Sequence, residues 1–265
     1  MHLGIIPDGN RRFCKESGIK QSELTGVLTG VVEGMLADLV ALWTGAADPA
    51  LAAELAPLLD VDRVTVFLLS ANNVEKRTDM SKANALNMIE RMFSGVGGGG
   101  GGGGEGGGGG SEGGECGGGG GEGGECGGAP RGGTDSTALL LGKALACFGG
   151  ELSVSVVGDR SLLPPDVDHK LAHMQRECKG ARYFLTLAVG YDGEKDLDGG
   201  LSREEVPPID AVFRSGREKR LSGFFPRQTM HSELIFSDKL WPQIRLRDIA
   251  EAVTEFRSRN RLFGA

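Results

Sequence analysis

The residues whose types and spacing best suit chemistry begin at Asp8. The segment 5–13 reads IIPDGNRRF, an apolar run that ends in an aspartate, a glycine and an asparagine before two arginines. The glycine lets backbone amides approach an anion, and the N-terminus of a following helix adds partial positive charge. Arg11 and Arg12 can neutralise phosphate oxygens. Because Asp8 would repel a bare diphosphate, its presence indicates a bridging Mg²⁺ bound by oxygen ligands. An ordinary strand–turn–helix in which Asp8 or Asn10 caps the helix fits the same spacing.

A second cluster of cations lies in the C-terminal third of the chain. Residues 213–225 read FRSGREKRLSGFF and continue directly from an apolar run. Its polar side chains include Arg214, Arg217, Lys219, Arg220 and Ser222. In open α/β sheets, ligands bind at the carboxyl ends of strands, which is where this cluster is expected. Two diphosphate-sized sites, one with an acid for a metal, predict an enzyme that joins two phosphorylated substrates. The alternative is a solvated basic loop, which is the more common role of a run of charges.

The elements that must position these residues alternate between strand and helix. Short apolar runs rich in β-branched residues predict strands at 3–7, 64–69, 154–157, 183–189 and 209–213. Helical periodicity predicts helices at 27–43, 81–93, 137–148 and 246–259. Continuously apolar strands favour a parallel sheet covered on both faces. The predicted fold class is therefore α/β, with a central, mostly parallel sheet flanked by helices.

Residues 97–128 interrupt this pattern with 24 of the chain's 46 glycines. Two near-copies of one octapeptide, SEGGECGG at 111–118 and GEGGECGG at 121–128, mark a duplicated low-complexity tract. Glycine has the largest backbone entropy to lose on folding, and the tract offers no apolar surface in return. The turn-forming composition continues to residue 136. We therefore expect a single domain over residues 1–265, interrupted at 97–136 by a disordered insertion without chemistry of its own.

Charge and composition limit the classes of function. The 265-residue chain has a net charge of −7, and removing the five glutamates of the glycine tract leaves −2. A nearly neutral body argues against nucleic acid as a partner, because such binding needs a basic face. Five scattered cysteines indicate reduced intracellular thiols. No secretory signal is visible, and no stretch approaches the ~18 apolar residues that span a bilayer. We therefore expect a cytoplasmic protein that is soluble or peripheral to a membrane.

Six segments match one protein family in order along most of the chain. They are HLGIIPDGNRRF at 2–13, VTVFLLSANNVEKR at 64–77, VVGDRSLLP at 156–164, LTLAVGYDGEKDL at 185–197, FRSGREKRLSGFFPRQTMHSELIFSDKLWP at 213–242 and RSRNRLFG at 257–264. Together they resemble the cis-prenyltransferase family, also called undecaprenyl or dehydrodolichyl diphosphate synthases. The resemblance implies a parallel sheet flanked by helices, an apolar tunnel for the growing chain, and a homodimer or heterodimer.

The resemblance also implies an activity. Such an enzyme condenses isopentenyl diphosphate onto an allylic diphosphate such as farnesyl diphosphate and makes a long polyprenyl diphosphate, the precursor of dolichol or undecaprenol. Mg²⁺ and cationic groups stabilise the departing diphosphate. Because the product is insoluble in water, we expect peripheral contact with the endoplasmic reticulum or the inner membrane surface. The alternative is a non-catalytic partner subunit of such an enzyme.

The same resemblance assigns roles to individual residues. Asp8 is the metal-binding catalytic acid, Glu233 is the second metal-associated acid, and Asn73 assists proton removal. The residues implied to bind substrate are Gly9, Asn10, Arg11, Arg12, Phe13, Ser70, Ala71, Asn72, Lys76, Arg214, Arg220, Leu221 and Ser222. Residues 9–12 hold the allylic diphosphate, whereas Arg214, Arg220 and Ser222 clamp the isopentenyl diphosphate.

The chain departs from the family pattern at several positions. The arginine and histidine expected after the first motif are absent from KQSELTGVLTG at 20–30. Asn72 replaces an acid, Lys76 replaces an arginine, and Leu262 replaces the arginine of a closing Arg-Xaa-Gly. Lost cations weaken the allylic diphosphate site and favour the partner-subunit alternative, whereas the presence of Asp8 favours catalysis.

Two further patterns resemble metal sites. Residues 194–205 nearly fit a calcium-binding loop, but they begin with Glu194 instead of aspartate and follow a strand. His169, His173 and Cys178 would share a surface helix, but no fourth zinc ligand accompanies them. We expect neither pattern to bind a metal.

Removing the glycine tract should leave the chain active. Replacement of residues 97–133 by a short Gly/Ser linker should keep turnover within roughly a few-fold, because loop length costs stability only as the logarithm of residue number. Incorporation of labelled isopentenyl diphosphate measures turnover, and circular dichroism shows whether the shortened chain folds. A large loss of activity in a folded protein would show that the tract has a working role.

Overall fold

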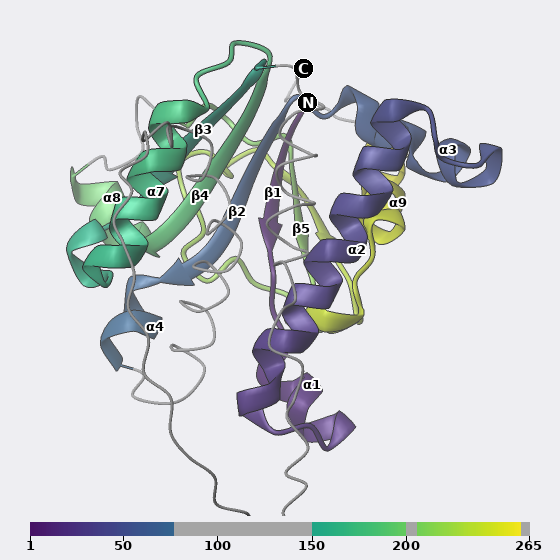
Figure 1. The fold of residues 1–265 in the computed structure, drawn as a ribbon. Coiled ribbons are helices and arrows are strands. Elements are labelled where there is room, and N and C mark those ends of the chain that lie inside the picture. Colours follow the sequence, from purple (N-terminus) through teal and green to yellow (C-terminus); the bar gives the residue numbers. More distant parts are fainter. Residues whose placement is uncertain (77–149, 200–205, 261–265) are drawn as a thin grey trace, which may run out of the picture.

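The structure, a computed structural model, describes residues 1–76, 150–199 and 206–260 (Figure 1). Its centre is a six-stranded sheet in the order β3-β4-β2-β1-β5-β6, and each neighbouring pair of these strands is parallel. The strands are β1 (His2–Ile6), β2 (Arg63–Ser70), β3 (Leu152–Val157), β4 (Tyr183–Tyr191), β5 (Ala211–Arg214) and β6 (Glu233–Phe236). The predicted α/β fold with a parallel sheet is therefore confirmed.

The helices connect these strands in chain order. They are α1 (Asn10–Ser17), α2 (Leu24–Thr44), α3 (Pro49–Leu55), α4 (Ala71–Lys76), α7 (Pro165–Glu177), α8 (Gly193–Gly199) and α9 (Leu246–Ser258). The helices predicted at 27–43 and 246–259 correspond to α2 and α9, and all five predicted strands are present. Periodicity did not reveal β6 and α3, which have only four and seven residues. The helices predicted at 81–93 and 137–148, and the glycine tract, lie outside the described residues.

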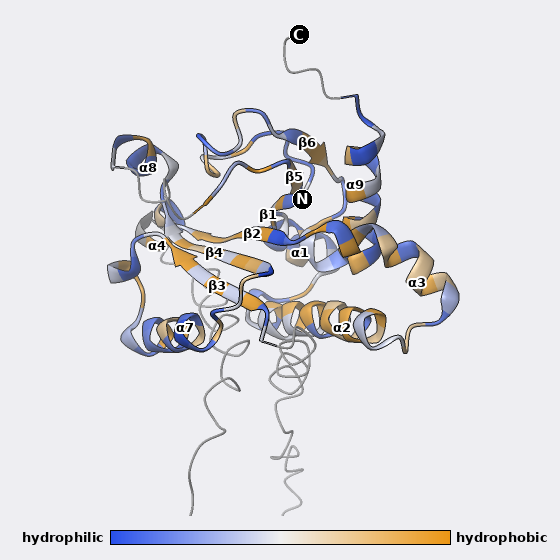
Figure 2. Cartoon of the chain, turned by 90° about the horizontal axis from the view of Figure 1, so that it is seen from above, coloured by the Kyte–Doolittle hydropathy of each residue, from blue (hydrophilic) through white to orange (hydrophobic). Residues whose placement is uncertain are grey.

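Alternate side chains of the strands pack on opposite faces of the sheet. β1 sends Leu3 and Ile5 into a core shared with α2 and α9. Figure 2 shows α7 in the same layer as α2, where it covers β3 and β4. On the other face, Ile6 packs with Phe224 and Phe225 from the segment that follows β5. Both faces are therefore covered, as continuously apolar parallel strands require.

The register brings the carboxyl ends of β1, β2 and β5 to one edge of the sheet. Ile6 at the end of β1 pairs with Arg214 at the end of β5, and Ile5 pairs with Val66, four residues before Ser70. β1 has β2 on one side and β5 on the other, so the strand order reverses at β1. Ligands of open α/β sheets bind at such a reversal. Figure 1 shows α1 and α4 at this same end of the sheet.

α2 is longer and more apolar than the sequence reasoning allowed. With the preceding turn η1 (Gln21–Glu23) it forms a helix over Gln21–Thr44 that could cross a membrane by length and composition alone. The expectation that no stretch reaches this length is therefore wrong, because interspersed glycine and threonine residues interrupt the apolar run without ending the helix. Leu24 and Leu28 pack in the sheet core, although only 22% of the most apolar window is buried.

His2 is a neutral imidazole buried between strands. Its Nδ1 lies 3.0 Å from the Pro208 carbonyl oxygen, which can only accept, so the proton resides on Nδ1. Nε2 then accepts a hydrogen bond from the Thr65 hydroxyl at 2.8 Å. Burial lowers the pKa of His2 from 6.5 to about 4, and the Pro208 bond opposes this only in part.

The free energy of unfolding should fall as the pH drops from 6.5 toward 4, because the unfolded chain binds a proton at His2 before the folded chain does. The contribution is complete above the unfolded pKa, and its loss at the lower limit amounts to about 3 kcal/mol. Urea unfolding at several pH values measures it. His2→Gln is the control, since it keeps a donor and an acceptor but does not titrate. The same pH dependence in both proteins would show that His2 is not the responsible group.

Candidate active site

Asp8 follows β1 in a turn that requires a glycine. Gly9 has a φ of 104°, and a Cβ there would lie 2.8 Å from Leu240 Cδ2 and 3.1 Å from the Leu240 Cα. The Trp241 amide donates to the Asp8 carbonyl at 2.9 Å. The Gly9 amide donates to the Asp8 carboxylate at 2.6 Å. The Trp241 amide therefore holds the main chain of Asp8, and the Gly9 amide orients its carboxylate.

Ser215 and Gly216 join this turn to the loop after β5. The Ser215 hydroxyl donates to the Asp8 carbonyl at 2.9 Å, and the Asp8 amide donates to the same hydroxyl at 3.0 Å. Gly216 has a φ of 94°, and a Cβ there would lie 2.7 Å from the Asp8 carbonyl carbon. Close contacts of the main chain therefore bring the two predicted cation segments together.

Arg214 is the buried charge at the centre of the site. Its side chain is 4% exposed, and its Nη2 donates to Asp8 Oδ2 at 2.8 Å. Its Nη1 donates to Ser222 Oγ at 3.0 Å and to the Arg220 carbonyl. A buried guanidinium without a counter-charge is strongly destabilising, so Asp8 is required for this arrangement.

Asp8 is ionised at neutral pH. Burial acts to raise the pKa of its carboxyl group. Hydrogen bonds from Arg214 and Gly9, with the charges of Arg214 and Arg12, outweigh burial and hold the pKa of Asp8 below its ordinary value. Arg12 Nη2 lies 3.2 Å from the same Oδ2 atom that Arg214 contacts. Two guanidinium groups thus converge on one carboxylate oxygen.

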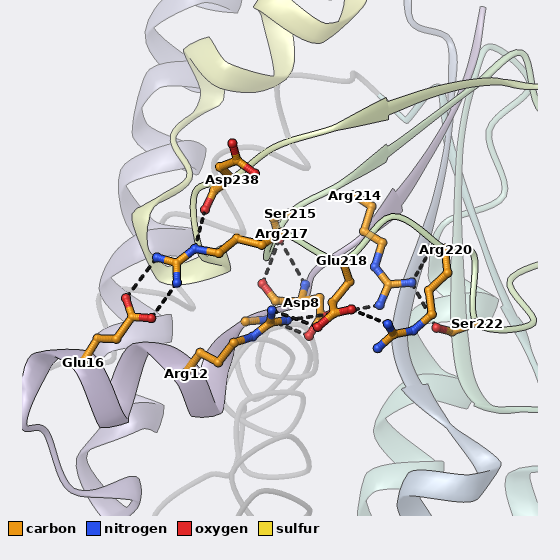
Figure 3. Close-up of polar contacts among 11 residues, drawn as sticks. Asp8, Arg12, Glu16, Arg214, Ser215, Arg217, Glu218, Arg220, Ser222 and Asp238 are labelled. Atoms are coloured by element: carbon orange, nitrogen blue, oxygen red, sulfur yellow. Dashed lines mark hydrogen bonds and ion pairs between the residues drawn. The ribbon is translucent and has the colours of Figure 1, made fainter.

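Glu218 links cations from the two predicted clusters. Arg12 Nη1 donates to Glu218 Oε1 at 3.1 Å, and Arg220 Nη1 donates to Glu218 Oε2. Figure 3 shows the resulting network, which includes Asp8, Arg12, Arg214, Arg217, Arg220 and Ser222 from the two predicted clusters. Sequence reasoning missed Glu218, although a single acid within the basic run REKR at 217–220 is a signal that could have identified it.

The predicted substrate-binding residues 70–76 follow the apolar part of β2, at the same edge of the sheet. The Asn73 amide, in the first turn of α4, donates to Ser70 Oγ at 3.2 Å. Ala71 is buried, Asn72 is exposed, and Asn73 is partly exposed. The side chain of Lys76 lies outside the described residues. Ser70 and Asn73 therefore lie at the same edge of the sheet as the network of charges.

The other predicted binding residues lie on α1 and in the loop after β5. Arg11 is exposed on α1, Phe13 is partly buried there, and Leu221 packs at the edge of a core cluster. Asn10 Oδ1 and Arg214 Nε are buried without a hydrogen-bond partner. Because folded proteins rarely leave such atoms unsatisfied, both are atoms that a ligand could satisfy. Arg214 Nε is a donor suited to a phosphate oxygen, whereas Asn10 Oδ1 is an acceptor.

Glu233 does not lie near Asp8 within one chain. It begins β6 and pairs with Ala211 at the start of β5, whereas Arg214, which contacts Asp8, ends β5. Its carboxylate instead accepts a hydrogen bond from Arg259 at 2.9 Å. The strand register thus places the two predicted metal-binding acids at opposite ends of the sheet, and a single chain does not bring them together.

The residues at this edge fit a magnesium ion that arrives with a diphosphate. Mg²⁺ is commonly held by one or two carboxylates together with substrate phosphates, and Asp8 supplies one ionised carboxylate. Both of its oxygens already accept hydrogen bonds, from Gly9 on one side and from arginines on the other. Among the residues that the structure describes, no group of three or more His, Cys, Asp or Glu side chains could hold a metal.

The described part of the calcium-like pattern is helical. Residues 194–199 belong to α8, and Asp196 is buried, where it accepts a hydrogen bond from the Tyr191 hydroxyl at 2.5 Å. In the zinc-like pattern, His173 lies in the last turns of α7, Cys178 directly follows the helix, and His173 Nδ1 is 3.5 Å from Glu177. Neither arrangement contributes to the site at the sheet edge.

The chain is similar to known proteins over nearly its whole length. Residues 193–264 match the family model Prenyltransf, which describes undecaprenyl diphosphate synthases. The chain is 28% identical to the tritrans,polycis-undecaprenyl-diphosphate synthase (geranylgeranyl-diphosphate specific) of Pyrobaculum aerophilum, over 99% of this chain and 95% of that protein. It is also 28% identical to the isoprenyl transferase of Chlorobaculum tepidum, over 99% and 85% of the two chains.

A solved structure has the same fold. Lavandulyl diphosphate synthase from Lavandula x intermedia, in complex with dimethylallyl diphosphate, matches with a TM-score of 0.65 and 20% sequence identity. The match covers 100% of this chain and 98% of that one. The family model, the two relatives matched over 99% of this chain and the shared fold all indicate similarity to undecaprenyl diphosphate synthases and isoprenyl transferases.

Proposed function

We propose that the protein is a cis-prenyltransferase that condenses isopentenyl diphosphate onto an allylic diphosphate to make a long-chain polyprenyl diphosphate. The observation that carries this proposal is the buried Arg214 guanidinium, held by Asp8 where the strand order reverses. A scaffold that only binds a partner has no need to bury a charge at a ligand-binding edge, which disfavours the non-catalytic alternative. The product would be a precursor of the dolichol or undecaprenol type.

The starter is an allylic diphosphate with its reactive carbon next to the leaving group. Farnesyl diphosphate is the starter that we expected from the sequence. The name of the Pyrobaculum aerophilum relative specifies geranylgeranyl diphosphate, so both starters belong in the test. Both carry the same diphosphate, and the charged network alone gives no basis for preferring one of them.

The charged residues orient the two diphosphates for carbon–carbon bond formation. Arg12 and residues 9–11 hold the allylic diphosphate, and Arg214, Arg220 and Ser222 hold the isopentenyl diphosphate. The allylic carbon–oxygen bond breaks, and its electron pair leaves with the diphosphate. The isopentenyl double bond forms the new carbon–carbon bond, and loss of a proton completes a cis double bond. The departing diphosphate takes up that proton, and Asn73, in the first turn of α4, assists the transfer.

Magnesium completes the charge balance. The network joins four arginines, Arg12, Arg214, Arg217 and Arg220, to three acids, Asp8, Glu16 and Glu218. A net charge of one is too small to neutralise a diphosphate. When bound, Mg²⁺ would neutralise the departing diphosphate, with Asp8 as the protein carboxylate that holds it.

Assembly and location extend the same proposal. If Glu233 shares a metal site with Asp8, a second copy of the chain must supply it, which favours a homodimer or a heterodimer. An apolar tunnel would receive the growing chain. Because the product is insoluble in water, we expect a cytoplasmic enzyme that binds the surface of the endoplasmic reticulum or of the inner membrane without crossing it.

Purified protein should make polyprenyl diphosphate from labelled isopentenyl diphosphate, Mg²⁺ and either starter. Asp8→Ala should remove nearly all turnover, because holding a metal against a leaving diphosphate contributes several kcal/mol to the transition state. Asp166→Ala, an exposed acid at the start of α7, is the matched control and should retain activity. If product formed only after a second subunit was added, the alternative of a non-catalytic partner subunit would be favoured. Full activity in Asp8→Ala would show that Asp8 does not hold a catalytic metal.

Arg220→Ala should mainly raise the KM for isopentenyl diphosphate. A charge-assisted phosphate contact that persists through the reaction contributes ground-state binding, worth roughly ten- to a hundredfold in affinity. Lys219→Ala removes the neighbouring exposed cation and is the matched control. Steady-state kinetics with each substrate varied in turn measures the effect. A variant that weakens only the allylic substrate would reverse the assignment of the two sites.

A further inference from the structure

Two ion pairs of opposite polarity join α1 to the loop after β5. We refer to residues 214–222 as the anion loop. On α1, Arg12 and Glu16 are one helical turn apart, and they face two consecutive residues of the anion loop. Arg12 pairs with Glu218, and Glu16 pairs with Arg217. The charges are therefore complementary in only one register of the loop along the helix.

Arg217 differs from the other cations of the anion loop in the direction of its side chain. Its Nη1 and Nη2 donate to the two carboxylate oxygens of Glu16 at 2.6 and 3.0 Å, and its Nε donates to the Asp238 carbonyl at 3.3 Å. Figure 3 shows its guanidinium beside Glu16 and Asp238, away from Arg214 and Arg220. Each nitrogen of the guanidinium thus donates to a protein oxygen, and the group is directed at Glu16 and Asp238 rather than at the cations of the substrate sites.

The backbone of Arg217 also departs from the usual pattern. Its φ is 72°, in the left-handed region that favours glycine over a residue with a Cβ. Its amide donates to the Ser237 carbonyl at 3.1 Å, so the residue connects the anion loop, α1 and the loop after β6. An exposed ion pair adds little to global stability. The Arg217–Glu16 ion pair offsets the cost of this backbone conformation, and its effect is to hold the anion loop in place rather than to stabilise the whole fold.

We propose that Arg217 is a positioning residue which, through Glu16, fixes the anion loop against α1 and so sets the separation between the two diphosphate sites. The inference rests on the proposed function, because it takes α1 and the anion loop as the two halves of a diphosphate-binding centre. Arg12 on α1 and Arg220 on the anion loop are both bound to Glu218, so a shift of the loop along α1 changes the separation of these two cations. Arg217 acts through this spacing and does not touch either substrate.

The substitution Arg217→Gly distinguishes an effect on the position of the anion loop from an effect on the stability of the fold. Glycine adopts the left-handed backbone without strain, so the midpoint of thermal unfolding should stay the same or rise. The dissociation constant for inorganic pyrophosphate with Mg²⁺, measured by calorimetry, should increase roughly three- to tenfold as the site loses its geometry. Hydrogen exchange at residues 216 and 217, whose amides donate to Lys239 and Ser237, should accelerate. An unchanged pyrophosphate affinity would overturn the proposal.

A charge exchange distinguishes a positioning residue from a direct ligand. Glu16→Arg and Arg217→Glu should each weaken pyrophosphate binding, and the double variant should restore most of it, because the pair reforms with reversed polarity. The matched control exchanges the exposed pair Arg182–Glu151, which lies at the opposite end of the sheet, and should have no effect. If the double variant stays as weak as Arg217→Glu, Arg217 is itself an anion ligand and the proposal is wrong.

The readouts separate this inference from the proposed function. If the protein binds pyrophosphate but makes no polyprenyl product, the proposed function is wrong. The positioning role of Arg217 is then still tested by pyrophosphate affinity and by amide hydrogen exchange. A chain that makes product at an unchanged KM for both substrates in Arg217→Gly contradicts the positioning role alone.

Discussion

The structure depends on one requirement: a guanidinium buried to 4% exposure must have a counter-charge. Asp8 supplies it from the turn after β1, and Arg214 reaches it from the end of β5. This contact is possible only because the two strands are parallel neighbours whose ends coincide. Gly9 and Gly216, which have no Cβ, allow the two turns to approach each other and the loop near Leu240. The position of the site therefore follows from the sheet order and from the need to neutralise Arg214.

The same charges that stabilise the free protein are suited to bind a diphosphate. Arg12, Arg214 and Arg220 each pair with an acid, Asp8 or Glu218, or donate to a main-chain oxygen. A phosphate group can replace those acceptors because it offers the same oxygen chemistry with more negative charge. The site is thus preorganised by protein acids that resemble the ligand, and Arg214 Nε remains as a donor without a partner.

Local features of the fold could be predicted from the sequence, and long-range pairings could not. The strands, α2 and α9 follow from periodicity, because their apolar residues repeat along the chain. Asp8 and Arg214 follow from residue type and from their places after apolar runs. The separation of Glu233 from Asp8 depends on the register of β5 and β6, which no local pattern encodes. The pairing of Arg217 with Glu16 likewise joins residues from opposite ends of the sequence and requires a left-handed backbone.

A crystal structure of the protein with isopentenyl diphosphate tests the central claim most directly. Our account predicts the diphosphate at the carboxyl ends of β1 and β5, in contact with Arg214, Arg220 and Ser222, with Arg214 Nε donating to a phosphate oxygen. A diphosphate bound at another edge of the sheet would contradict the account. So would a complex in which Arg214 keeps the same contacts to protein oxygens and makes none to phosphate.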